Sequence, residues 1–250
     1  TLLMDQILSL SQELDLSIEG ESNRVAIADN ENIYDELSQI VGDFLETSEN
    51  RNVLAGLPGE FALKALEENE FEQYKVSHAL LKKLSTEWGD VGHKIRETNS
   101  LNDTVSSIRA LITIIANKNE IRWGDWLVAQ RKTFEVPEVA FSMQEKAPPL
   151  KANAKEYTQN LGIFEILEEN LPDSFDAITQ IETCANALRE CKQKMIFDLP
   201  QSMEKFFEYT GSAEHDFAFP LSMLTEEVKD WLENNGELQN YSIQRKTQGR

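Results

Sequence analysis

Apolar residues recur at alternating steps of four and three positions in the middle of the chain, which places them on one face of a helix. These positions are Leu101, Val105, Ile108, Ile112 and Ile115. Ser100 and Asp103 stand at capping-box spacing at the start of the stretch, and neither Gly nor Pro interrupts it. We therefore predict a buried central helix over residues 101–116. The polar residues 117–120 would end it, and a separate short helix would follow over residues 123–131.

Helical spacing also occurs on both sides of this stretch. It predicts amphipathic helices over residues 2–14 and 33–44, and helical structure from Glu60 to Trp88. Beyond residue 153 it predicts two long helices separated by only a few residues around Pro172. Such a short connection favours an antiparallel αα-hairpin. Shorter helices are expected around Phe206 and Trp231.

Two segments near the ends of the chain show a strand-like period instead. Leu14, Leu16 and Ile18 alternate with polar residues, as do Val25 and Ile27, and Gly20 to Asn23 between them suit a turn. The pattern fits a small β-hairpin or an irregular linker equally well. Tyr241 and Ile243 alternate in the same way, which indicates an edge strand in a docked C-terminal tail.

Residues 133–153 break the helical pattern. Residues 133–141 favour extended structure, and Pro148 and Pro149 cannot lie inside a helix. We expect a linker here, or a loop that crosses the body of one domain. The predicted fold is thus mainly α, a bundle-like body with an N-terminal part (1–132) and a C-terminal part (154–250), and at most a small β element near the termini.

The composition fits a globular helical protein: 40% of the 250 residues are hydrophobic and 27% are charged. Cys184 and Cys191 would lie about 10 Å apart on one helix, too far for a disulfide. Two free thiols suggest a reducing compartment, so we expect a cytoplasmic protein. No apolar run is long enough to span a membrane. Because the chain starts at Thr1 rather than Met, we expect a fragment of a larger protein.

The formal net charge of −20 is distributed unevenly. Residues 1–50 carry a net charge of −11, and residues 156–188 contain seven acids and no base. Residues 75–132 have the opposite balance, a net charge of +4. An acidic chain repels phosphate, so only this middle region is expected to contact nucleic acid.

No pattern typical of catalysis or of metal binding is evident. The turn at Gly56 to Gly59 lacks a P-loop because Glu60 and Phe61 replace the required Lys and Ser or Thr. The three histidines belong to no metal-binding pattern, and the two cysteines lack a second pair. We therefore predict no catalytic residue, cofactor or metal. One alternative is an enzyme whose site lies near His215, which has an acid on each side.

The bases of the middle region are the candidate contact residues for a nucleic-acid backbone or a protein partner. Those selected are Lys82, Lys83, Lys94, Arg96, Arg109 and Arg122. Tryptophans lie among them, as in proteins that bind single strands. Two of these tryptophans, however, have the spacing of core residues, and the acidic segments offer the bases partners within the protein. We therefore favour self-complementary charge over nucleic acid.

These observations predict a non-enzymatic, cytoplasmic helical segment that serves as a scaffold or interaction region of a larger protein or assembly. Its partner would be another protein or a neighbouring domain of the same polypeptide, and no membrane partner is expected. The alternative is a helical accessory region of a nucleic-acid-handling or ATP-driven machine, which would use the basic region 75–132.

Overall fold

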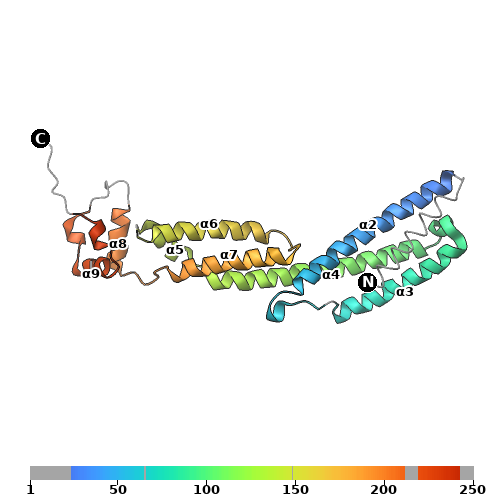
Figure 1. Ribbon diagram of the computed structural model, residues 1–250, viewed down its shortest axis with the longest axis horizontal. Helices are drawn as coiled ribbons and strands as arrows, with labels where there is room; N and C mark the ends of the chain where they lie inside the picture. Colours follow the sequence, from blue (N-terminus) through green and yellow to red (C-terminus); the bar gives the residue numbers. More distant parts are fainter. Residues whose placement is uncertain (1–23, 65, 148, 212–218, 243–250) are drawn as a thin grey trace. The chain divides into compact units, whose positions relative to one another are not determined.

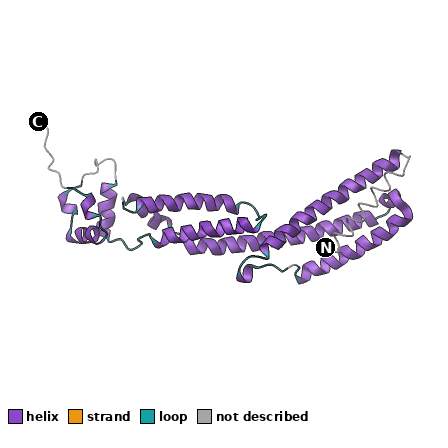
Figure 2. Cartoon of the chain, in the orientation of Figure 1, coloured by secondary structure: helices purple, strands orange, loops and turns teal. Residues whose placement is uncertain are grey.

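The computed structural model describes residues 24–64, 66–147, 149–211 and 219–242. These residues form eight α-helices and no strand, which confirms the mainly α prediction (Figures 1 and 2). The helices are α2 (Arg24–Leu54), α3 (Glu68–Val91), α4 (Ser100–Phe134), α5 (Glu138–Lys146), α6 (Lys151–Glu168), α7 (Phe175–Gln193), α8 (Gln201–Thr210) and α9 (Glu226–Asn234). Short 3-10 turns lie at Gly59–Phe61, Gly92–Glu97, Leu221–Met223 and Leu238–Asn240. None of these described helices is both long enough and apolar enough to cross a membrane.

The chain divides into two compact units. The first contains Thr1–Val128 and Asn170–Thr179, and the second contains Ala129–Glu169 and Gln180–Arg250. Both divisions fall within helices, α4 and α7, rather than in the segment 133–153.

In the first unit, α2 and α4 run parallel to each other. Arg109 Nη2 lies 3.5 Å from Glu36 Oε1, and further along both helices Asn119 Nδ2 donates to the Thr47 carbonyl at 3.1 Å. The contacts advance together along the two sequences, so the helices point the same way.

The third helix of this unit, α3, runs antiparallel to α4. Ser77 Oγ lies 2.9 Å from Ser107 Oγ, whereas Asn69, which precedes Ser77, accepts from Lys118 at 2.6 Å. The three helices thus form an up-down-up bundle, the arrangement expected from short connections between consecutive helices.

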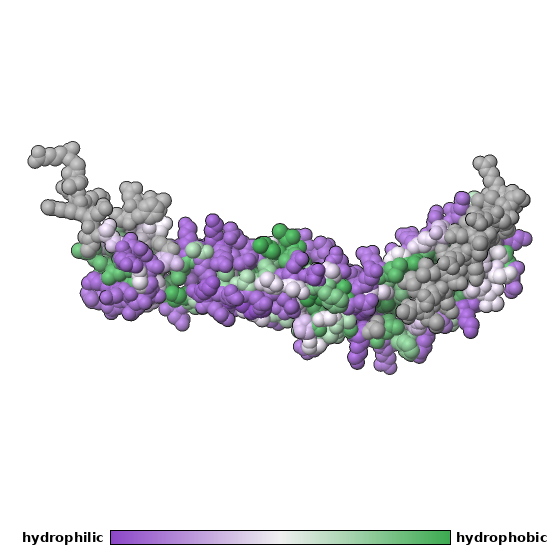
Figure 3. Space-filling view, viewed as in Figure 1, coloured by the Kyte–Doolittle hydropathy of each residue, from purple (hydrophilic) through white to green (hydrophobic). Residues whose placement is uncertain are grey.

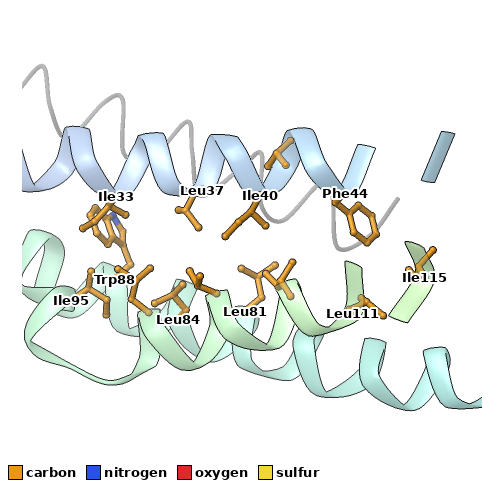
Figure 4. Packing of buried hydrophobic residues seen from close by; sticks show 14 residues of the cluster. Ile33, Leu37, Ile40, Phe44, Leu81, Leu84, Trp88, Ile95, Leu111 and Ile115 are labelled. Carbon is orange, nitrogen blue, oxygen red and sulfur yellow. The ribbon is translucent and has the colours of Figure 1, made fainter. Parts of the chain in front are cut away.

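The core of this bundle is built from the apolar stripes of all three helices. Figure 4 shows the apolar side chains of α2 pointing toward those of α3 and α4. The buried members are Ile33, Leu37, Ile40, Val41, Phe44, Leu81, Leu84, Trp88, Ile95, Leu101, Val105, Ile108, Leu111 and Ile115. Ile112 packs against them and is partly buried. The predicted buried stripe over residues 101–116 is therefore confirmed.

The predicted end of the central helix was wrong. Helix α4 continues without a break to Phe134, and the short separate helix is its C-terminal part. Asn119, which resembled part of a polar helix end, is only 1% exposed and bonds to α2. Trp123 and Trp126 are both buried, with ring centroids 5.0 Å apart.

In the second unit, α6 and α7 run antiparallel and pack on the end of α4. Asn153 Nδ2 donates to the Cys191 carbonyl at 2.9 Å, and Cys184 Sγ donates to the Asn160 carbonyl at 3.1 Å. These contacts cross between the helices at opposite ends of the pair, which fixes their directions.

Aromatic residues join α4 to α6. The Tyr157 hydroxyl donates to the Phe134 carbonyl at 3.1 Å, and the rings of Phe134 and Phe164 meet edge to face at 5.0 Å. A further apolar cluster forms around α8 and α9. Its buried members are Ala147, Met203, Phe206, Phe207, Val228 and Leu232.

The expected extended segment over residues 133–141 was also wrong. Phe134 ends α4, and after three residues Pro137 is the N-cap of α5. A proline is tolerated there because the first helical amides need no partner within the helix. Val139 is 83% exposed, so its apolar character does not indicate a buried strand.

Neither predicted β element is present in the described part of the chain. Val25 and Ile27 lie in the first turns of α2, while the rest of the expected hairpin falls outside the described residues. Tyr241 is not in a strand; it packs on Phe206 with ring centroids 5.3 Å apart. Ile243 also lies outside the described residues.

Candidate interaction surfaces

A buried ion pair holds the ends of α2 and α3 together. The side chain of Arg51 is 4% exposed and that of Glu70 is fully buried, and Arg51 Nη2 contacts Glu70 Oε1. Glu70 Oε2 also accepts from the backbone N–H of Glu67 at 2.6 Å, which completes a capping box at the start of α3. Arg51 Nη1 reaches the Lys64 carbonyl at 3.5 Å. The pair therefore orients the loop that leads into α3.

Lys118 extends this network from α4. Its Nζ donates to Glu67 Oε2 at 2.5 Å and to Asn69 Oδ1 at 2.6 Å. The hydrogen bond from Lys118 lowers the pKa of Glu67, with further lowering by the charge of Lys118 that outweighs the effect of partial burial. One turn on, Arg122 Nη1 donates to the Glu60 carbonyl at 2.8 Å. These bases of the middle region hold the fold of the first unit together.

The six candidate contact residues do not form one surface. Arg109 is paired with Glu36 of α2 and Arg122 with the backbone of residue 60. These two arginines lie about 20 Å apart along α4 at a rise of 1.5 Å per residue. The paired arginines support the preference for charge complementarity within the protein, while contact with an external partner stays a prediction.

The other four candidates lie at the end of α3 and in the 3-10 turn that follows it. Lys82, Lys83, Lys94 and Arg96 are exposed. Lys83 Nζ lies 3.5 Å from Glu87 Oε1 one turn further along α3. The remaining three make no ion pair with the residues that the structure describes. They leave a small basic group facing solvent.

Aromatic rings are stacked along the other half of α3. The ring centroids of Phe71 and Tyr74 are 6.3 Å apart, and those of Tyr74 and His78 are 6.0 Å apart. Lys75 Nζ lies 4.5 Å from the centroid of Phe71, a cation–π contact. Phe71 is 46% exposed. This arrangement offers a ring face and a positive charge to a partner.

Helix α6 carries the most acidic of the exposed apolar surfaces. Gln159, Ile163 and Ile166 follow one another at steps of four and three, so they share one face of the helix, and the two isoleucines are 50% and 69% exposed. Gly162 lies beside them, and no atom stands within 4 Å of the place where its Cβ would be. We call Gln159, Gly162, Ile163 and Ile166 the α6 face. Figure 3 shows hydrophobic residues gathered over the end of α6.

Carboxylates border the α6 face. Glu156, Glu165 and Glu169 are exposed on the same helix. Glu168, in contrast, is used internally: its two oxygens accept from Arg131, one of them from Nε at 3.0 Å. This hydrogen bonding raises the pKa of Arg131 further above its usual range. The free carboxylates beside an apolar face suit a partner that is both basic and apolar.

Two cavities lie within the units. One, of about 400 Å³, lies between α2, α3 and α4 and is bordered by Arg51, Tyr74 and apolar residues of the core. The other, of about 330 Å³, lies beside Arg131 and Tyr157. In both, the arginine is already paired with a glutamate. Neither cavity brings a nucleophile together with a base, as hydrolytic catalysis requires.

Within the described ranges no group of His, Cys, Asp and Glu residues could hold a metal ion. Cys184 and Cys191 are free and buried, and burial is the main cause that raises the pKa of each thiol. A raised pKa leaves the thiol neutral and unreactive. His215 lies outside the described residues.

Several of these features give no signal in the sequence. Arg51 and Glu70 are 19 positions apart and belong to different predicted segments, so their pairing follows only from the fold. Ile163 and Ile166 could have been found, since they fall opposite the stripe that contains Phe164. Comparison of the chain with protein-family models, with curated proteins and with solved structures finds no match.

Proposed function

We propose that this chain is a non-enzymatic helical segment that binds another protein through its α6 face, as a scaffold or interaction region of a larger cytoplasmic assembly. The observation that carries the proposal is the exposure of Ile163 and Ile166 beside free carboxylates. Side chains of this size lose about 1.5 to 3 kcal/mol of favourable burial when they are left in water, so a partner that covers them is stabilised.

The charge of the surrounding segment indicates the chemistry of the partner. Residues 156–188 contain seven acids and no base, and Glu168 is the acid that Arg131 neutralises. A partner with Lys or Arg around an apolar centre would satisfy both properties of the surface. Opposite charges across an interface mainly accelerate association and exclude wrong partners.

The test compares partner binding by the full chain with binding by the double variant Ile163→Gln and Ile166→Gln. Glutamine keeps the helix propensity and removes the apolar surface. A protein captured by the wild type is identified, purified and titrated against each variant. We expect the double variant to bind at least about tenfold more weakly, because two exposed apolar contacts are lost. Binding should also weaken with added salt.

Val139→Gln is the matched control, since Val139 is even more exposed, at 83%, but lies on α5. It should bind the partner as the wild type does. Equal affinity of the double variant and the wild type for the purified partner would contradict the proposal. Circular dichroism must show the same helix content in all three proteins.

A second candidate function is contact with a nucleic-acid backbone. Lys82, Lys94 and Arg96 face solvent, and the stacked Phe71 and Tyr74 lie on the same helix as Lys82. Bases that stack on rings beside positive charges are typical of proteins that bind single strands. Fluorescence anisotropy with a labelled oligonucleotide tests this. Affinity should fall steeply with salt and fall again in Lys82→Gln/Arg96→Gln, whereas no binding at low salt would exclude it.

A further inference from the structure

A second apolar row lies on the solvent side of α4. Ile114, Ile121 and Val128 are spaced seven residues apart, which is close to two helical turns, so they form one line along the helix. Ile121 is 64% exposed, Val128 is 51% exposed and Ile114 is half-buried. All three belong to the first unit. The opposite side of α4 contributes the stripe that fills the core.

We propose that this row is the contact between two copies of the chain, paired antiparallel about a two-fold axis that passes beside Ile121. The row is symmetric about its central residue. A two-fold rotation therefore places Ile121 against Ile121 of the second copy and Ile114 against Val128 of the second copy, twice. Such an isologous contact uses the same surface patch on both subunits and closes at two copies.

The charges beside the row fit the same arrangement. Lys118 and Asp125 flank Ile121 on one side, at three positions before it and four positions after it. In an antiparallel pair the same sides of the two helices face each other, so Lys118 of one copy stands beside Asp125 of the other. Asp125 is exposed and is paired with no base of the described residues. Lys118 is 24% exposed, which leaves it accessible.

The other side of the row has room for close approach. Gly124 has no atom within 4 Å of the place where its Cβ would be, and in the paired arrangement Asn117 of the second copy lies next to it. A small residue at this point lets two helices come together. A displacement of the partner by one turn would instead align Asp125 with apolar residues, so the register is specific.

The size of the contact limits its strength. The row from Ile114 to Val128 is about 21 Å long at 1.5 Å per residue, which is short for a stable interface. The net charge of −20 on each copy also opposes association at low salt. We therefore expect a weak dimer, detectable by its dependence on concentration at about 0.15 M salt, where charges more than about 8 Å apart are screened.

Sedimentation equilibrium of the full chain over a wide concentration range tests the proposal. The average mass should rise from 28.5 kDa toward twice that value. Ile121→Glu places two carboxylates together at the axis, and we expect it to weaken dimerisation at least about tenfold. Val139→Glu and the double variant Ile163→Gln/Ile166→Gln change similarly exposed residues elsewhere and should dimerise as the wild type does.

Cross-linking locates the axis independently. In Ile121→Cys the two new thiols lie next to each other, so a short bismaleimide should link two chains efficiently. Val139→Cys should not be linked, and the native Cys184 and Cys191 are buried. A wild-type chain that stays at 28.5 kDa at the highest attainable concentration would overturn the proposal, as would a dimer that Ile121→Glu leaves intact. The α6 variants distinguish this outcome from failure of the proposed function.

Discussion

The pairing of Arg51 with Glu70 is the most deeply buried charge interaction that the structure describes. We predict that Glu70→Gln lowers the free energy of unfolding by about 3 kcal/mol, because it leaves the guanidinium of Arg51 buried without an opposite charge. It also weakens the acceptor that caps the Glu67 amide. Urea unfolding followed by circular dichroism gives the difference between variant and wild type.

The exposed pair of Arg109 and Glu36 supplies the control for this prediction. Their side chains are 53% and 30% exposed. Glu36→Gln should change the free energy of unfolding by no more than about 1 kcal/mol, since water already screens the two charges. Equal effects of the two substitutions would show that the burial of Glu70 has no energetic consequence, against the prediction.

Tyr241 is the residue whose protonation is most affected by the fold. Burial raises its pKa to about 12, and the charge of Glu237 adds to this. A folded-state pKa above the unfolded value of about 10 means that the folded form retains the proton longer, so this contribution to stability is complete below pH 10 and is lost as the pH rises to about 12.

We therefore predict that the free energy of unfolding falls between about pH 10 and pH 12 and falls less steeply in Tyr241→Phe. Phenylalanine keeps the ring contact with Phe206 and removes the ionisable hydroxyl. Absorbance at the tyrosinate band measures the titration, and urea unfolding at each pH measures the stability. Identical slopes in the two proteins would contradict the assignment of the raised pKa to this residue.

The individual residues show which part of the structure a sequence can predict. Leu101, Ile108 and Leu111 are buried as their spacing indicates, because helical periodicity alone decides which face meets the core. The partner of Arg51 could not be predicted in this way. It depends on the path of the loop after α2, which no periodic pattern describes.

Among the elements, α4 differs most from its prediction. Polar residues 117–120 are typical of a helix end, yet the helix continues because Asn119 finds a buried partner in the Thr47 carbonyl of α2. A tertiary hydrogen bond thus overrides a local signal. The predicted strands failed for a related reason, since two or three alternating residues are too few to distinguish a strand from the first turns of a helix.

The continuity of α4 makes a prediction about Gly124, which lies in its interior. Gly124→Ala should raise the free energy of unfolding by about 0.5 to 1 kcal/mol, because alanine restricts the unfolded chain and meets no atom within 4 Å. Chemical unfolding of the variant and the wild type measures the gain.

Gly211→Ala supplies a control with the opposite sign. A Cβ at Gly211 would stand 2.8 Å from the Lys146 carbonyl oxygen, so this substitution should lower the free energy of unfolding. If Gly124→Ala also destabilised the protein, an uninterrupted helix around Gly124 would be contradicted.

At the scale of the whole molecule, the excess of 44 acidic over 24 basic residues dominates the electrostatics. Like charges repel in the compact state, and salt screens this repulsion more than it weakens close or buried pairs. The paired bases Arg51, Lys118 and Arg131 are all at least partly buried. We therefore predict that the midpoint of thermal unfolding rises as salt increases from about 20 mM to about 200 mM.

Two sets of charge variants test whether net repulsion is the cause. Glu165→Gln/Glu169→Gln removes two exposed acids and should raise the midpoint at low salt and reduce its dependence on salt. Lys205→Gln removes an exposed base from α8 and should act in the opposite direction. A midpoint that falls with salt in the wild type would show instead that local ion pairs outweigh the net charge. The acidic surface would then contribute to stability as well as to the choice of a basic partner.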